Sequence, residues 1–223
     1  AMIDWHLFPD GAELAAEASR RISKAAQQAI RRHGMFKLVL AGGTTPLRVY
    51  RLLSATRQDW GRWELFYGDE RCLPENDPDL NQSLVKSTGL AGKAGMHHPI
   101  NVQLGAQRAA FQYGRLLEAV MPFDMVLLGM GEDGHTASLF PQHNWPDDNV
   151  IAVHDAPKPP GERVSLSPAA LRNCRQLLVL VSGAGKRDAV AAWRAGRQLP
   201  IALVTCDRRV DVLLDSAASG EAA

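Results

Sequence analysis

The sequence predicts an α/β fold in which helices cover both faces of a mainly parallel sheet. Short apolar runs alternate with stretches whose apolar residues recur at helical spacing. Glycine-containing turns follow several of these runs, where a strand would pass into a helix. Because 223 residues can enclose one large hydrophobic core, we expect residues 1–223 to form a single domain.

Residues 1–128 are predicted to contain three strands, each of which is followed by a glycine. A helix over residues 11–33 has Asp10 as its N-cap and Gly34 as its stop, and the buried strand 36–41 follows it. The next helix has Pro46 in its first turn, where proline is favoured. Further along, the pattern indicates a strand at 63–67, a polar loop from Gly68, helices at 81–88 and 106–120, and a strand at 125–128.

The second half continues the alternation. Strands at 150–153 and 163–166 flank a proline-rich loop at 157–161, and Ser167 and Pro168 are typical of a helix start. The apolar strand 176–181 leads into a glycine-rich turn at 182–186 and a helix to about residue 195, and Pro200 precedes a last strand at 201–205. Ligands in such folds bind at the carboxyl ends of the strands, so these turns are the candidate sites.

Composition and charge narrow the possible partners. Lys and Arg number 25 and Asp and Glu 24, a formal net charge of +1, and no long basic run occurs, so we expect no nucleic-acid partner. No apolar stretch approaches the roughly 20 residues that span a bilayer, and the first residues lack a signal-peptide pattern. We therefore expect a soluble, cytoplasmic protein without a membrane partner. Cys72, Cys174 and Cys206 form no C-x-x-C pair and are interpreted as reduced thiols.

Residues 129–141 carry the strongest indication of chemistry. This glycine-rich segment follows the apolar run 125–128 and sets Asp133 two residues before His135. Histidine exchanges protons near neutral pH, so His135 could take a proton from water while Asp133 or Asp69 orients its ring. The alternative is a histidine that only caps the following turn.

Two other strand ends could hold an anionic group. Backbone N–H groups and threonine hydroxyls could cradle a phosphate in the first turn, which comprises Gly42, Gly43, Thr44 and Thr45. An ordinary tight turn is the alternative there. Asp69, Glu70 and Arg71 close the second strand, and the planar guanidinium of Arg71 suits phosphate or carboxylate. The alternative for these three is a surface ion pair, in which Glu70 has only a structural role.

Three later cations could add positive charge to the site. Lys158, Arg163 and Lys186 lie in or beside loops, and Lys186 follows a glycine-rich turn at a helix start. Each could equally be a solvated surface residue. The histidines show no H-x-x-x-H spacing and no acidic cluster accompanies them, so we expect no metal site.

The motifs taken together resemble the 6-phosphogluconolactonase family. They are the runs 40–46, 67–71, 131–141 and 163–167, and their order and spacing match over nearly the whole chain. The resemblance implies an α/β/α sandwich around a Rossmann-like sheet, the fold shared with glucosamine-6-phosphate isomerases. It also implies hydrolysis of 6-phospho-D-glucono-1,5-lactone to 6-phospho-D-gluconate, the second step of the oxidative pentose phosphate pathway, without a redox cofactor or a metal.

The resemblance also implies the roles of the site residues. His135 would be the general base that activates water, and Asp133 or Asp69 would orient it. The turn Gly42 to Thr45 would bind the phosphate with Arg71, Lys186 and Arg163, while Lys158 stays open between phosphate and oxyanion. We expect a monomer or a weak homodimer.

Two other functions are alternatives to the lactonase. Glucosamine-6-phosphate deaminases carry a glutamate five residues after the histidine and an Asp-Glu-Tyr run, whereas this chain has Phe140 and Arg71. A silent sugar-phosphate sensor of the transcription-regulator type would carry a DNA-binding domain. We expect the first helix to lead directly into the first strand, which leaves no room for such a domain. The Asp133 and His135 pair also favours an enzyme.

Overall fold

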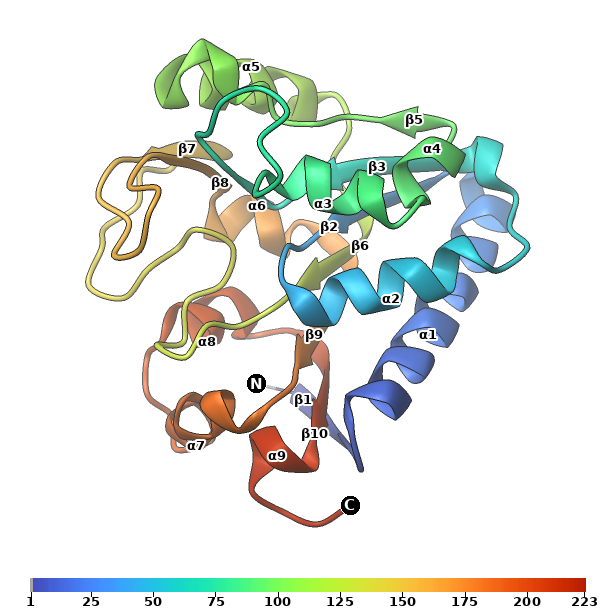
Figure 1. The fold of residues 1–223 in the computed structure, drawn as a ribbon, viewed down its shortest axis with the longest axis vertical. Coiled ribbons are helices and arrows are strands. Elements are labelled where there is room, and N and C mark those ends of the chain that lie inside the picture. Colours follow the sequence, from blue (N-terminus) through green and yellow to red (C-terminus); the bar gives the residue numbers. More distant parts are fainter. Residues whose placement is uncertain (1) are drawn as a thin grey trace.

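A seven-stranded sheet forms the centre of the structure, a computed structural model that describes residues 2–223 (Figure 1). Within those residues every pair of neighbouring strands in this sheet is parallel, in the order β1-β10-β9-β6-β2-β3-β5. The prediction of a mainly parallel sheet is confirmed. The strands are β1 (Met2–Phe8), β2 (Phe36–Leu40), β3 (Trp63–Tyr67), β5 (Met96–His97), β6 (Phe123–Leu128), β9 (Cys174–Val181) and β10 (Arg209–Asp215).

Helices flank the sheet and complete the three-layer α/β/α arrangement (Figure 1). The two longest of the first half, α1 and α2, contact each other, and α1 also packs against β2, β6 and β10. The helices are α1 (Gly11–His33), α2 (Thr44–Ser54), α3 (Asn81–Ser87), α4 (Leu90–Lys93), α5 (Ala106–Glu118), α6 (Pro168–Arg172), α7 (Arg187–Arg194), α8 (Pro200–Thr205) and α9 (Ser216–Ser219). No helix among the described residues is long and apolar enough to cross a membrane.

A second, three-stranded sheet lies beside the first and carries part of the site. It is antiparallel, with the order β4 (Asp69–Arg71), β8 (Arg163–Leu166) and β7 (Val150–Val153), and α5 packs against β7 and β8. The strands expected at 150–153 and 163–166 are confirmed. The loop expected from Gly68 is wrong at residues 69–71, because their backbone pairs with β8, opposite residues 163–165. Residues 69–71 are all charged, so their sequence does not indicate a strand.

Local capping explains the helix boundaries that the sequence predicts. The carboxylate of Asp10 accepts the backbone N–H of Glu13 at 2.9 Å, and Gly34 ends α1 at a φ of 87° with its N–H on the Ile30 carbonyl. Ser167 caps α6 in the same way, with Pro168 at the first helical position. These predictions are confirmed.

The last predicted strand, residues 201–205, is wrong, since this segment forms helix α8. Pro200 occupies the first helical position, where its ring favours a helix start. Ile201, Val204 and Thr205 are buried while the two residues between them are half-buried, so the apolar spacing is that of a short helix. A run of five mostly apolar residues did not distinguish the two structures.

The edge strand β1 and its neighbour β10 were not predicted. They pair in parallel along their whole length, from Met2 opposite Arg209 to Phe8 opposite Asp215. The sheet therefore begins before α1, and the expectation that the first helix precedes the first strand is wrong. β1 lies at an edge of the sheet, where its residues are exposed or half-buried and none is buried, so its apolar signal is weak.

Candidate active site

The strand ends converge on one cavity at the carboxyl edge of the central sheet. The cavity has a volume of about 260 Å³, and the turns that follow β2, β3 and β6 line it. β6, β2 and β3 are neighbours in the sheet, so residues distant in the sequence meet there. This position agrees with the rule that ligands of open α/β sheets bind beyond the carboxyl ends of the strands.

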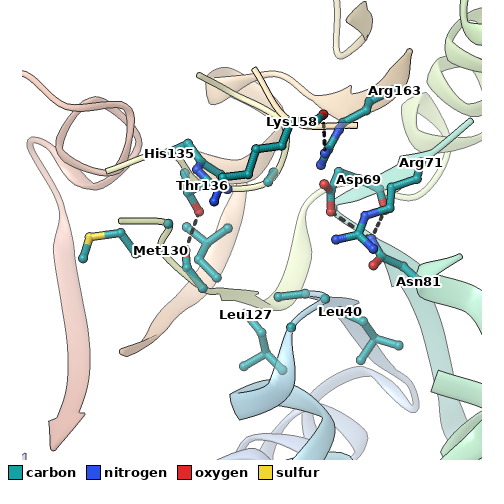
Figure 2. A pocket seen from close by; sticks show the side chains of 18 of the residues that line it. Leu40, Asp69, Arg71, Asn81, Leu127, Met130, His135, Thr136, Lys158 and Arg163 are labelled. Carbon is teal, nitrogen blue, oxygen red and sulfur yellow. Dashed lines mark hydrogen bonds between the residues drawn. The ribbon is translucent and has the colours of Figure 1, made fainter. Parts of the chain in front are cut away.

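Eight of the eleven residues predicted for the site line this cavity, and Figure 2 shows several of them facing one another across it. They are Gly42, Gly43, Asp69, Arg71, His135, Lys158, Arg163 and Lys186. Thr44 and Thr45 begin α2 behind the glycine turn, outside the lining. Asp133 lies in an adjoining cavity of about 350 Å³, which His135 and Lys158 also line.

The imidazole of His135 is held by the carboxylate of Asp133. Oδ1 of Asp133 lies 2.5 Å from the ring Nδ1 and also accepts the backbone N–H of His135 at 3.0 Å. Partial burial alone would raise the pKa of Asp133, but the backbone N–H and the ring of His135 lower it overall. A carboxylate at Nδ1 favours the tautomer that carries its hydrogen there, which leaves Nε2 with a free lone pair.

Glycine at position 131 makes room for the His135 ring. A methyl group on Gly131 would lie 2.0 Å from both Cε1 and Nδ1 of the ring, far inside contact distance. The ring also packs against Phe140, with 4.8 Å between centroids and 43° between planes. The backbone of Gly131 also accepts the N–H of Gly134 and donates to the carbonyl of His135, which closes the turn.

Asp69 has partners other than His135. Its Oδ2 accepts the hydroxyl of Ser138 at 2.8 Å, and its Oδ1 accepts the side-chain amide of Asn81 at 3.2 Å. Burial raises the pKa of Asp69, and the Ser138 hydrogen bond and the charge of Arg163 oppose that rise. Of the two carboxylates that the sequence left open, Asp133 is therefore the one in contact with the ring.

Glu70 has a structural role. It is fully buried, and its two carboxylate oxygens accept the backbone N–H groups of Arg71, Asn81 and Gln82 at 2.7 to 3.0 Å. Two of these groups belong to the first turn of α3, so Glu70 fixes that helix against β4. Burial raises the pKa of Glu70 to about 7, although the three N–H groups act in the opposite direction.

The raised pKa of Glu70 predicts a pH-dependent stability. Between about pH 4.5 and pH 7 the unfolded chain ionises Glu70 while the folded protein keeps the proton. The free energy of unfolding should therefore fall as pH rises through this window, by up to about 3 kcal/mol relative to a variant that cannot titrate. Urea denaturation of the wild type and Glu70→Gln from pH 4.5 to pH 8 measures the two slopes. Parallel slopes would contradict the assignment.

Cationic side chains dominate the cavity. Arg71 donates to the carbonyl of Asp79 at 3.1 Å and extends across the cavity toward Asp69 and Asn81 (Figure 2). Lys158 lies beside His135 in the same view. Lys186 follows the turn after β9 and lines the cavity. The carboxylate of Asp215 holds this turn by accepting the N–H of Gly183 at 3.1 Å. Such a set of cations suits an anionic ligand.

Arg163 also lines the cavity, but its Nε and one terminal nitrogen donate to a neighbouring loop. Its guanidinium donates to the carbonyls of three successive residues, 158 to 160, at 3.1 to 3.4 Å and lies 5.5 Å from the centroid of the Phe140 ring.

Among the described residues, no group of three or more His, Cys, Asp or Glu side chains is arranged to hold a metal ion.

Sequence reasoning missed several residues that line the cavity. The sequence predicts Asn81 only as the start of a helix. A methyl group on Gly42 would lie 2.4 Å from the Oδ1 of Asn81, so the glycine at this position makes room for the Asn81 side chain. The remaining unpredicted side chains come largely from the turn after β6. They include Met130, Glu132, Thr136 and Ala137. The glycine at position 42 is the one sequence signal that suggests a close neighbour at that point.

Comparison with known proteins gives consistent results. The family model described as glucosamine-6-phosphate isomerases/6-phosphogluconolactonase matches residues 9–213. A 6-phosphogluconolactonase of Mycobacterium tuberculosis is 36% identical over 210 residues, which cover 85% of each chain. The crystal structure of a 6-phosphogluconolactonase from Thermotoga maritima has a TM-score of 0.87 at 26% identity, covering 96% of this chain and 99% of that one. The enzyme from Trypanosoma brucei gives 0.86 at 28% identity, covering 100% and 98%.

Proposed function

Because the chain belongs to the family of glucosamine-6-phosphate isomerases and 6-phosphogluconolactonases, we infer that it hydrolyses 6-phospho-D-glucono-1,5-lactone. It is a lactone hydrolase, and its product is 6-phospho-D-gluconate, in the pentose phosphate pathway. The mechanism rests on one feature of the site. A carboxylate-bound histidine and a lysine line a cavity that is also lined by three more cationic residues, Arg71, Arg163 and Lys186.

In the proposed mechanism His135 is the general base. Its Nε2 takes a proton from water while the resulting hydroxide attacks the C1 carbonyl of the lactone. The tetrahedral intermediate then collapses, the bond between C1 and the ring oxygen breaks, and the imidazolium returns its proton to that oxygen. Asp133 orients the ring and stabilises its protonated form, a role that the 2.5 Å contact at Nδ1 supports.

We assign the oxyanion to Lys158. The negative charge develops on the former carbonyl oxygen, next to the water that His135 activates. Lys158 lines both cavities that meet at His135, so its ammonium is within the same small region as the base. A six-membered lactone is already reactive, so one base, one cation and correct positioning are a sufficient catalytic set.

The phosphate is assigned to the opposite side of the cavity. The turn of Gly42, Gly43, Thr44 and Thr45 forms the N-terminus of α2, whose first N–H groups point away from the helix and favour an anion. Arg71 and Lys186 add two full charges to this turn. The glycines allow the close backbone approach, since Gly43 has a φ of 101°.

Removing a phosphate cation should affect only phosphorylated substrate. We expect Lys186→Ala to lower kcat/KM for the 6-phosphorylated lactone by about 10- to 100-fold, the effect of losing a charged hydrogen bond worth about 1.5–3 kcal/mol. The rate with unphosphorylated glucono-1,5-lactone should be unchanged, and Lys93→Ala, in the distant helix α4, is the matched control. An equal loss with both substrates would place Lys186 outside the phosphate site.

No feature of the site favours the deaminase reaction. Deaminases of this family carry a proton-relaying glutamate at the position of Phe140. The Phe140 ring is 3% exposed and packs against His135, and it has no group that can accept a proton. An assay with glucosamine 6-phosphate should therefore show no ammonia release, whereas the lactone generated in situ should be hydrolysed above its spontaneous rate.

We further propose that residues 1–223 act as one catalytic domain in the cytoplasm, as a monomer or weak homodimer, without a nucleic-acid or membrane partner. Cys72, Cys174 and Cys206 are free thiols, which fits a reducing compartment. Light scattering after size-exclusion chromatography across a range of concentrations tests the assembly state. A stable higher oligomer would contradict it.

A further inference from the structure

The guanidinium of Arg163 is used to hold a loop. Arg163 is 6% exposed at the start of β8, and its Nε donates to the carbonyl of Pro160 at 3.1 Å. One terminal nitrogen donates to the carbonyls of Lys158 at 3.1 Å and Pro159 at 3.4 Å. Three consecutive carbonyls of one loop therefore converge on a single buried side chain.

We propose that Arg163 is a positioning residue that holds Lys158 beside His135, where Lys158 stabilises the oxyanion. This inference rests on the proposed lactonase mechanism and replaces the phosphate role that the family resemblance suggested for Arg163. Its bonds go to the backbone of the residue that carries the ammonium group. A shift of that backbone would move the cation away from the reacting carbonyl, and misplacement by about 1 Å can cost about 10²-fold in rate.

The loop has few other anchors. Residues 154–162 connect β7 to β8, and most of their side chains are exposed. Apart from the bonds to Arg163, Ala156 donates to the carbonyl of Gly161 at 3.1 Å, His154 contacts Glu162 at 2.7 Å, and the carbonyl of Glu162 accepts the N–H of Cys72 at 3.0 Å. These contacts hold the two ends of the loop and leave its tip, residues 158–160, to Arg163. Arg163 is thus the contact that ties the loop tip to the protein interior.

Phe140 joins the two halves of this arrangement. Its ring has the guanidinium of Arg163 at 5.5 Å and the imidazole of His135 at 4.8 Å. An arginine over an aromatic ring is attracted by the ring electrons, and its planar fork can bond several carbonyls at once. A lysine has one compact ammonium and cannot reproduce this geometry. The buried Phe140 ring therefore contacts both Arg163, which holds the loop of Lys158, and the proposed base His135.

The test compares Arg163→Lys with Arg163→Gln on phosphorylated and unphosphorylated lactone. We expect both variants to lower kcat by about 10- to 100-fold with either substrate, with little change in KM, because the oxyanion is common to both reactions. Lys186→Ala is the matched control, since its loss should be confined to the phosphorylated lactone. A loss with phosphorylated substrate alone, expressed as a higher KM, would instead place Arg163 on the phosphate and overturn the proposal.

A double-mutant cycle with Lys158→Ala tests the connection directly. If Arg163 acts through Lys158, Arg163→Lys should change kcat by less than about twofold in the Lys158→Ala background. Multiplying losses would show that the two residues act independently and would overturn the proposal. Lys158 is exposed, so its alanine variant should fold.

Hydrogen exchange supplies a readout that does not depend on activity. We expect the backbone N–H groups of Asp155, Ala156, Lys158 and Gly161, the non-proline residues of the loop, to exchange faster in Arg163→Lys than in wild type, while those of the central sheet keep their rates. Unchanged exchange in the loop would contradict the proposal. Arg163→Lys keeps the charge and the aliphatic stem in the buried site, so it serves if Arg163→Gln does not fold. Failure of the lactonase assignment would appear separately, as a wild type without activity.

Discussion

His135→Ala is expected to lower kcat for the 6-phosphorylated lactone by about 10²- to 10⁴-fold, the usual contribution of a general base. The imidazole is the side chain that Asp133 holds at 2.5 Å with a nitrogen left for water. Lys158 and Lys186 keep their places in the variant, so substrate should still bind and KM should change little. The residual rate would measure what positioning and positive charge achieve without the base.

The measurement needs lactone generated in situ near neutral pH, with the spontaneous hydrolysis subtracted and a chelator present. His143→Ala is the matched control, because His143 is an exposed histidine in the same segment, bonded to the carbonyl of Pro141. Asp133→Asn should give an intermediate loss, since it keeps the base and removes the charge that orients it. A His135→Ala enzyme with wild-type kcat would show that another group activates water.

Gly131→Ala is expected to remove most activity, about 10²-fold or more, with a much smaller effect on stability. The added methyl would lie 2.0 Å from two atoms of the His135 ring, so the ring must leave its position. The ring is the end of a partly exposed side chain and can rotate away, so the fold should survive. The base would then be present but misplaced, and kcat should fall without a matching rise in KM.

Gly129→Ala is the matched control for this variant. A methyl group at Gly129 would meet only the carbonyl oxygen of Gly42, at 3.9 Å, which is an ordinary contact. We expect it to retain activity within a few-fold of the wild type. Thermal unfolding and kcat/KM should be measured on both variants together. Equal losses in the two would mean that the turn tolerates no side chain, and the specific conflict with His135 would be excluded.

The sequence predicted the site better than the sheet around it. Strand ends with glycine and titratable residues are local patterns, so His135, Asp69 and Lys186 could be assigned to one region without knowing the fold in detail. The choice between Asp133 and Asp69 could not be made, because it depends on which carboxylate lies near the ring. Asp69 instead accepts a hydrogen bond from the hydroxyl of Ser138, a residue 69 positions away in the sequence.

Other errors have the same physical origin. Residues 69–71 form a strand only because β8 lies opposite them, and residues 201–205 form a helix through burial of Ile201, Val204 and Thr205. Local propensity does not contain either contact. Arg163 shows the limit most clearly, since its type suits a phosphate but its Nε and one terminal nitrogen donate to the carbonyls of its own loop.

The pairing of β1 with β10 has a consequence for synthesis on the ribosome. β1 is synthesised before the other strands of the sheet, but its partner begins at Arg209, so the nascent strand stays unpaired until residues 209–215 have followed it. β10 also carries Asp215, which holds Ser182 and Gly183 in the turn before Lys186. A nascent chain that stops short of β10 would therefore lack both a closed sheet and a fixed phosphate cation. Catalytic competence should arise only after β10 has been synthesised and paired.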